Sequence, residues 1–292
     1  LEQCAVVLPQ SYRIPRAVHG LAIDIISRMP GYVPVDYRAR DADGYVRSCQ
    51  AAEVVDRAVE QADNGDTVML LAPANYMLEQ YIAELRRQGV PFHNPFRTRN
   101  GAWNPLRKGG VADKARDFMK ILTQDRWTPY EIKQWTSALT PSKLWIRGQA
   151  AAAKRDIEFL MGSDLTVAEQ DDLIYNLLTQ RALPDALPHL WEADINWFLD
   201  HAKGGASVEY LANIRASGRL DQTVPRIVVG TIHSVKGGQA DHVYLSTDLS
   251  VAQYQDRDEQ AGALARMFYV GATRAREGVT VINQTGARGY PI

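Results

Sequence analysis

The pattern of the chain changes twice along its length, and these changes constrain the fold more than any other feature. Short apolar runs alternate with amphipathic helical stretches over residues 1–99, and the same alternation returns after Pro225. Such alternation is typical of an open α/β sheet with parallel strands. Residues 100–222 instead show mainly helical periodicity. We therefore predict one α/β domain, residues 1–99 and 223–292, interrupted by a helical insertion subdomain, residues 100–222.

The expected strands of the α/β part are short apolar runs. Residues 67–72 are the most distinctive, because a continuous apolar run is typical of a strand buried on both faces of a parallel sheet. The other expected strands are residues 5–8, a short one near 45, 89–93, 226–230, 242–245 and 279–283. The expected helices of this part are residues 16–29, a stretch that ends near 62, 78–87 and 259–275.

The expected helices of the insertion follow apolar residues at helical spacing. They are residues 111–122, 129–139, 142–159, 167–179, 189–201 and 207–216. The insertion also holds most of the tryptophans, namely Trp127, Trp135, Trp145, Trp191 and Trp197, with Trp103 at its entrance. We interpret these rings as core residues, with stacking on nucleic-acid bases as the alternative.

The composition excludes several classes of protein. The net charge of −1 gives no global basic surface, so any contact with nucleic acid has to come from a local patch. Cys4 and Cys49 are the only cysteines, which suits reduced thiols better than a disulfide framework, and their spacing predicts no metal site. No signal peptide is visible and no apolar run approaches the roughly 18 residues of a membrane span, so we expect a cytoplasmic protein. The chain begins in mid-pattern without an initiator Met, and we interpret it as an excised fragment.

Arg13 is the first candidate site residue. It follows the expected strand at residues 5–8, on a polar turn into the helix that begins near Pro15. Ligands of open α/β sheets bind at that edge, and a guanidinium group matches the oxygens of a phosphate. The alternative is a surface arginine that caps a neighbouring element.

A second group of candidates follows the expected strand at residues 226–230. The hydroxyl of Thr231 and the imidazole of His233 can hold a phosphate without sequence preference. Lys236 and Gly237 place a positive charge on a tight turn, a pattern that many ordinary turns share. His233 has little support as a catalytic base, because no Ser, Cys or Asp stands at a recognisable spacing from it.

Arg274 is the third candidate, near the end of the expected helix at residues 259–275. A cation there is favoured by the helix dipole, so a purely structural role is one interpretation. The functional interpretation is an arginine finger directed at the γ-phosphate of a nucleotide on another domain. Arg266 and Arg276 flank it and are equally well explained as solvated charges.

The order of these segments is more specific than any one of them. Gln10-Ser-Tyr-Arg13, then Thr231-Ile-His-Ser-Val-Lys-Gly237, then Tyr269-Val-Gly-Ala-Thr-Arg274 resembles motifs IV, V and VI of superfamily 1 DNA helicases of the UvrD/Rep/PcrA-like group. The resemblance covers the α/β part, a little over half of the chain. It implies a second RecA-like domain, and the helical insertion falls where those helicases also insert a subdomain.

The resemblance also implies roles for individual residues. Arg13 and Arg274 would contact the γ-phosphate of ATP, and Gln10 would belong to the same nucleotide-contacting set. Thr231 and His233 would touch the backbone of single-stranded DNA. The remaining roles fall to Gln239 at the nucleotide ribose, to Lys236 and Gly237 in the loop between the ATP and DNA sites, and to Tyr269 and Thr273 beside Arg274.

Two departures from the family pattern limit this transfer. Gln239 is neutral where the family usually has a Glu, so a ribose contact would lack charge assistance. After the run at residues 67–72 the family often has an Arg, whereas this chain continues Ala72-Pro-Ala-Asn75.

The sequence also lacks the parts that hold a nucleotide in the first domain of such a motor. No Gly-x-x-x-x-Gly-Lys-[Ser/Thr] loop is present, and no apolar strand ends in Asp-Glu to hold Mg²⁺. We expect both on an N-terminal RecA-like domain that precedes Leu1, with ATP and Mg²⁺ bound there.

We therefore interpret the chain as the C-terminal half of an ATP-dependent DNA helicase or translocase, inactive as an ATPase by itself. One alternative is a helicase-like module that hydrolyses nothing and serves as a binding scaffold. Another is the motor arm of a helicase–nuclease. RNA as the track also stays open, because contacts with the backbone alone do not distinguish the sugar.

Overall fold

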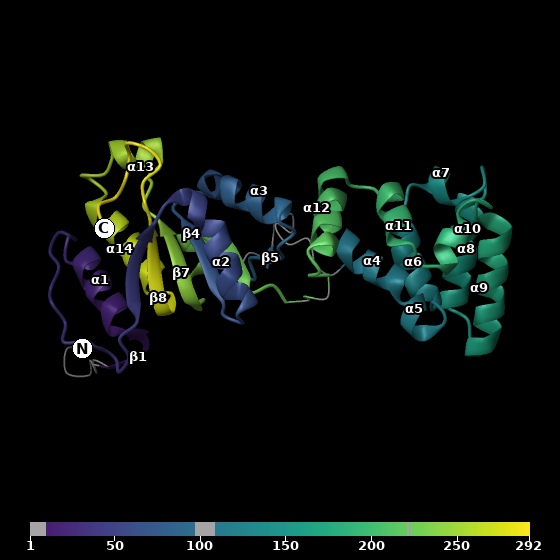
Figure 1. The fold of residues 1–292 in the computed structure, drawn as a ribbon, viewed down its shortest axis with the longest axis horizontal. Coiled ribbons are helices and arrows are strands. Elements are labelled where there is room, and N and C mark those ends of the chain that lie inside the picture. The colour runs from purple at the N-terminus through teal and green to yellow at the C-terminus, as the bar shows by residue number, and fades with distance from the viewer. Residues whose placement is uncertain (1–9, 97–108, 221, 223) are drawn as a thin grey trace. The chain divides into compact units, whose positions relative to one another are not determined.

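The computed structural model describes residues 10–96, 109–220, 222 and 224–292, and two compact units can be described separately (Figure 1). The α/β unit comprises Leu1–Trp103 and Val224–Ile292, and the helical unit comprises Asn104–Thr223. The strand expected at residues 5–8, Cys4 and Trp103 lie outside the described residues.

The α/β unit is built on a six-stranded parallel sheet, in the order β3-β8-β7-β4-β6-β5. This confirms the α/β fold class, and the arrangement is RecA-like. In chain order the strands are β3 (Tyr45–Cys49), β4 (Val68–Ala72), β5 (Phe92–His93), β6 (Ile227–Thr231), β7 (Ala240–Ser246) and β8 (Ala275–Ile282). β4 lies between β6 and β7, with Val68 opposite both Ile227 and His242. Every residue of β4 is buried, as its apolar run predicted.

Helices cover the sheet, and the alternation of side chains along each strand decides which core each residue joins. Met69 and Leu71 point into a cluster that contains Val18 of α1 and Phe268 of α14. α2 packs on β4 and β6 and also contacts α3. The helices of this unit are α1 (Arg16–Ile26), α2 (Val54–Asp63), α3 (Glu79–Arg87), α13 (Val251–Gln255) and α14 (Ala261–Ala272).

A separate pair of short parallel strands precedes α1. β1 (Gln10–Pro15) pairs with β2 (Arg38–Arg40) and packs near β8. The polar turn expected around Arg13 is therefore wrong, because Arg13 lies inside β1. The segment mixes buried and accessible residues without a regular alternation or a continuous apolar run, and its pairing with β2 identifies it as a strand.

The helical unit consists of short helices joined by tight turns. They are α4 (Val111–Met119), α5 (Ile121–Gln124), α6 (Pro129–Ala138), α7 (Pro141–Leu144), α8 (Ala150–Met161), α9 (Val167–Arg181), α10 (Leu187–Trp191), α11 (Ile195–His201) and α12 (Gly205–Ala216). Three of the expected helices are divided. The helix expected at residues 111–122 is split at Lys120 into α4 and α5. Trp145 leaves the helical conformation to form an antiparallel bridge with Ala182, and Ala193 has a φ of 48° just before Asp194 caps α11.

Aromatic rings form much of the core of the helical unit. Phe118 stacks on Trp127 and on Phe198, with ring centroids 5.9 and 4.9 Å apart. The indole of Trp127 donates a 2.8 Å hydrogen bond to the carbonyl of Phe118. Trp127, Trp135 and Trp145 are buried, so for these three rings the core interpretation is correct. In the described ranges, no helix combines the length and the apolar character that crossing a membrane requires.

Candidate nucleotide and nucleic-acid interface

Arg274 is held in place by three hydrogen bonds immediately after α14. Its Nε donates to the carbonyl of Val270 at 2.9 Å, its Nη1 to the carbonyl of Gly238 at 3.1 Å, and its Nη2 to the hydroxyl of Thr273 at 3.3 Å. All three acceptors are neutral, and no carboxylate in the described part of the chain forms an ion pair with it. The hydrogen bonds therefore fix the guanidinium while its charge stays uncompensated.

Arg13 adds a second uncompensated charge beside Arg274. Burial lowers the pKa of Arg274, and the neighbouring charge of Arg13 lowers it further. The Nε atom of Arg13 is buried and has no hydrogen-bond partner among the described residues. Two guanidinium groups that repel each other in a half-buried place create a site that an anion would stabilise. This is the electrostatic requirement for holding a phosphate.

The backbone of β1 positions Arg13. The hydroxyl of the buried Ser11 accepts hydrogen bonds from the amides of Arg13 and Ile14, at 3.2 and 3.0 Å. This local turn bends the strand just before Pro15, which then precedes α1 with an extended ψ of 167°. The side chain of Arg13 is thereby presented toward the end of α14 from a different element of the chain.

Tyr269 and Thr273 lie beside the two arginines. Burial raises the pKa of the Tyr269 hydroxyl, and the charges of Arg13 and Arg274 act on it in the opposite direction. Thr273 is buried, donates from its Oγ1 to the carbonyl of Val270 at 3.1 Å and accepts from Arg274. The structure thus brings together Arg13, Tyr269, Thr273 and Arg274, and their roles stay predictions.

The loop after β6 is shaped by Thr231. Its hydroxyl accepts from the amide of Ser234 at 3.3 Å and caps the short 3-10 helix η5 (Ile232–Val235), while its carbonyl accepts from the Ser234 hydroxyl at 2.8 Å. Gly237 then has a φ of 92°, a conformation that favours glycine. As a result, His233 and Lys236 are exposed on the outside of the loop.

His233 and Lys236 share a hollow of about 320 Å³ with residues of α14. Met267 and Val270 line its apolar part, and Arg266 also lines it. The structure therefore groups the basic side chains of His233, Lys236 and Arg266, which span 33 positions of the sequence. Sequence reasoning treated Arg266 as a solvated charge. Arg266 and Val270 are four residues apart, which places both on one face of the helix. This spacing could have predicted that Arg266 lies beside the loop.

The two glutamines of the predicted site are placed differently. The side-chain amide of Gln10 donates to the carbonyls of Ala39 at 2.7 Å and Ser11 at 2.9 Å, so it ties β1 to β2. Gln239 is exposed between Gly238 and the start of β7. Within the described part of the chain, the hydrogen bonds of the Gln10 side chain involve no other predicted site residue.

Asn94 organises the loop from a distant position and was missed. Its buried amide donates to the carbonyl of Val229 and to the hydroxyl of Ser234, each at 3.1 Å, and it accepts from the amide of Phe96. Asn94 and Val229 are 135 residues apart, so no local pattern could have linked them.

The arrangement can hold a phosphate between Arg13 and Arg274, and backbone phosphates near His233, Lys236 and Arg266. Arginine and lysine donors of this kind bind phosphate oxygens without reading a sequence. Within the residues that the structure describes, no three His, Cys, Asp or Glu side chains gather as a metal-binding group.

A known protein family matches part of the chain. Residues 226–282 match the family model described as the UvrD-like helicase C-terminal domain. The matched segment runs from β6 to the end of β8 and contains both Thr231 and Arg274, whereas Arg13 lies outside it. No curated protein matches the chain. The match supports the resemblance to the C-terminal region of UvrD/Rep/PcrA-like helicases.

Proposed function

We propose that this chain is the C-terminal half of an ATP-dependent DNA helicase or translocase. The premise is the match of residues 226–282 to the UvrD-like helicase C-terminal domain, which makes the α/β unit part of a helicase motor. ATP and Mg²⁺ would bind on a preceding RecA-like domain. The carrying observation is the pair of Arg13 and Arg274, two half-buried guanidinium groups that no carboxylate neutralises among the described residues.

In this proposal the two arginines act on the charge of the transferring phosphoryl group. That group spreads negative charge over its oxygens in the transition state, and fixed cations stabilise it without having to reorganise. The three hydrogen bonds of Arg274 supply this fixed position. An arginine finger of this kind contributes roughly 10³–10⁵ to the rate in related phosphoryl-transfer enzymes. ATP would bind on the preceding domain, whereas both arginines lie on this unit. They would therefore act only when the cleft between the two domains is closed.

Contact with a single strand would follow from the loop after β6. The hydroxyl of Thr231 accepts the amide of Ser234 and keeps its own proton for a phosphate oxygen, and His233 is exposed two residues later. The bond from Arg274 to Gly238 connects this loop to the nucleotide side. Closure of the cleft would therefore alter the grip on DNA, which is the basis of directional stepping.

The test is Arg274→Ala in the enzyme that includes its N-terminal RecA-like domain. We expect DNA-stimulated ATP hydrolysis to be lost while ATP binding, measured with a fluorescent nucleotide, stays nearly unchanged. Arg276→Ala is the matched control, because Arg276 is an exposed arginine two positions away whose Nε lies 3.7 Å from Asp241. Turnover that survives in Arg274→Ala would remove the arginine-finger assignment.

A second test uses the chain of residues 1–292 alone. Because the phosphate loop is expected on another domain, the purified chain should hydrolyse no ATP even with single-stranded DNA. Hydrolysis stimulated by DNA would contradict the half-site proposal.

A further inference from the structure

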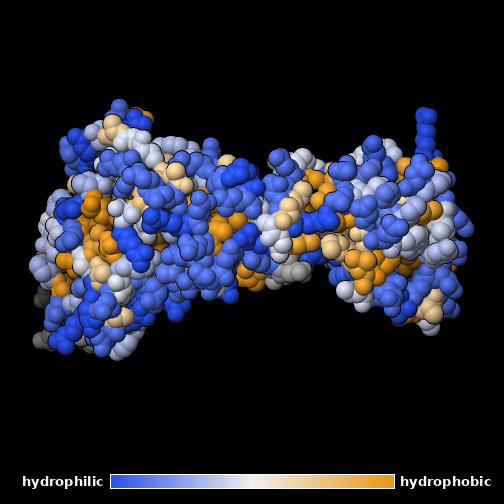
Figure 2. All heavy atoms as spheres, in the orientation of Figure 1, coloured by the Kyte–Doolittle hydropathy of each residue, from blue (hydrophilic) through white to orange (hydrophobic). Residues whose placement is uncertain are grey.

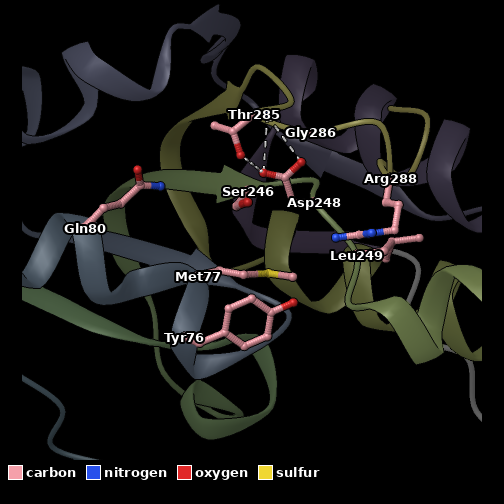
Figure 3. Close-up of a pocket in the computed structure, with 9 residues that line it drawn as sticks. All are labelled: Tyr76, Met77, Gln80, Ser246, Asp248, Leu249, Thr285, Gly286 and Arg288. Carbon is pink, nitrogen blue, oxygen red and sulfur yellow. Dashed lines mark hydrogen bonds between the residues drawn. The ribbon is translucent and has the colours of Figure 1, made fainter.

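A small polar pocket lies at the carboxyl end of the sheet and is separate from the arginine pair (Figure 3). Its walls come from the segments that follow β4, β7 and β8, and its volume is about 180 Å³. Arg274 instead precedes β8, so it lies at the amino end of the sheet. The pocket and the arginine pair are therefore at opposite edges of the strands.

The chain connections mark this pocket as a ligand position. From β4 the chain passes through α3 to β5 on one side of the sheet, and from β7 it passes through α14 to β8 on the other side. β4 and β7 are neighbours, so the direction of the connections reverses between them. Ligands of open α/β sheets bind outside the carboxyl ends of the strands at such a switch point.

The wall opposite Tyr76 is fixed to the core. After β8 the chain returns antiparallel to residues 247–249. The amide of Leu249 donates to the carbonyl of Arg288, and the amide of Tyr290 donates to the carbonyl of Thr247, each at 2.8 Å. The ring of Tyr290 is buried and stacks on Phe268, with centroids 4.5 Å apart. This wall of the pocket is thus held in place by the core.

Thr285 orients the carboxylate of Asp248. The hydroxyl of Thr285 donates to its Oδ2 at 2.6 Å, and the amide of Thr285 lies 3.3 Å from both carboxylate oxygens. Among the described residues, Oδ1 therefore receives one long bond and retains acceptor capacity. Figure 3 shows the carboxylate between Thr285 and Arg288, with the ring of Tyr76 across the hollow. No carboxylate forms an ion pair with Arg288 in the part of the chain that the structure describes.

These groups match one planar ring better than a whole nucleotide. Pockets for drug-sized ligands occupy about 300–1,000 Å³, and this one is smaller. Tyr76 is 55% exposed, and its ring offers a stacking surface. A carboxylate oxygen with free acceptor capacity, such as Oδ1, can accept from two adjacent N–H groups, and a guanidinium donates to a neighbouring acceptor. Guanine alone among the DNA bases presents two adjacent N–H groups, at N1 and N2, beside an acceptor at O6.

We propose that this pocket selects a guanine base, with Oδ1 of Asp248 accepting from N1 and N2, Arg288 donating to O6 and Tyr76 stacking on the ring. The inference rests on the proposed function, because the base arrives as part of the single strand that Thr231 contacts. Thr231 ends β6, which is the neighbour of β4, so both positions lie at the same edge of the sheet. The motor would then dwell on guanine as the strand passes.

The test measures equilibrium binding of the 292-residue chain to labelled oligothymidylates that carry one central guanine or one central hypoxanthine. Hypoxanthine lacks only the amino group at position 2, so it removes one of the two donors to Asp248. We expect guanine to bind at least about fivefold more tightly. Asp248→Asn should bind the two equally, and Tyr76→Ala should weaken both. Asp258→Asn, an exposed aspartate beyond the end of α13, is the matched control and should keep the preference.

The outcomes separate this inference from the proposed function. Tight binding without a base preference, or a preference that persists in Asp248→Asn, overturns the guanine pocket and leaves the DNA contact intact. If no oligonucleotide binds, saturation-transfer NMR with free guanosine and inosine decides. Guanosine contact that depends on Asp248 would keep the pocket and overturn the DNA role, whereas no contact overturns both.

Discussion

Arg274 donates a 3.1 Å hydrogen bond from its Nη1 to the carbonyl of Gly238, and this bond joins the end of α14 to the loop that precedes β7. The same guanidinium lies beside Arg13 on β1. Segments separated by more than 200 residues in sequence are therefore combined at one charged position. If the proposed function is correct, a displacement of Arg274 on nucleotide binding would move the loop that carries His233 and Lys236.

Gly238 tolerates no side chain in its present surroundings. A Cβ atom there would come within 2.6 Å of Cε2 of Phe96 and 3.1 Å of Cε of Met69. We expect Gly238→Ala to lower the free energy of unfolding by about 1–3 kcal/mol, measured by urea denaturation. Gly20→Ala is the control, since nothing lies within 4 Å of that position on α1 and alanine favours a helix by about 0.5–1 kcal/mol. Equal effects of the two substitutions would show that the contact with Phe96 yields without cost.

Thr273 positions Arg274 through its hydroxyl. Thr273→Val keeps the shape of the side chain but leaves Nη2 of Arg274 without its 3.3 Å acceptor. In the complete enzyme we expect kcat for ATP hydrolysis to fall while KM for ATP changes little, with a smaller loss than in Arg274→Ala. Thr273→Ser should restore turnover because it retains the hydroxyl. A valine variant with normal kcat would show that the other two hydrogen bonds of Arg274 suffice.

Glu131 should make the helical unit sensitive to acid. Burial acts to raise the pKa of its carboxyl, but hydrogen bonds from Lys120 and Thr128 outweigh burial and leave the pKa below its ordinary value of 4.5. A carboxylate with a lowered pKa in the folded state stabilises it above that ordinary value, and this contribution is lost as the pH falls through the folded pKa. We expect Glu131→Gln to cost about 1–2 kcal/mol at pH 7, and the cost to shrink with acidification.

The control for Glu131 is an exposed ion pair of the same unit. Glu158 lies 3.7 Å from Lys133 and is half exposed, so Glu158→Gln should change the free energy of unfolding by less than about 1 kcal/mol. The measurement is thermal or urea unfolding at several pH values. A pH-independent difference between Glu131→Gln and the unaltered chain would contradict the assigned protonation.

Arg266 should contribute to nucleic-acid binding through a phosphate. Neutralising one phosphate contact on a single strand changes the slope of log K against log salt by about 0.7. We expect Arg266→Ala to reduce the slope by about that amount for oligonucleotides of any sequence. Arg87→Ala should leave the slope unchanged, because Arg87 is paired with Glu84 on α3. Identical slopes for Arg266→Ala and the unaltered chain would exclude the contact.

The fold was predictable where burial alone sets the pattern. β4 is buried along its whole length, and its continuous apolar run indicated this. Predictions failed where a tertiary contact or one unusual residue decides. The single helix expected over residues 142–159 is wrong because Trp145 pairs with Ala182, and that over 189–201 is wrong because Ala193 adopts a positive φ.

The sequence by itself determined the alternation of strand and helix, the order of the three motifs and the identity of the residues that carry charge. Local periodicity and side-chain chemistry are properties of neighbouring residues, so they are readable along the chain. Only the tertiary structure decided that Arg13 meets Arg274, that Arg266 joins His233 and Lys236, and that Asp248 faces Tyr76 at the carboxyl edge. These pairings depend on the strand order, which is fixed by packing between segments distant in sequence and leaves no mark on the local pattern.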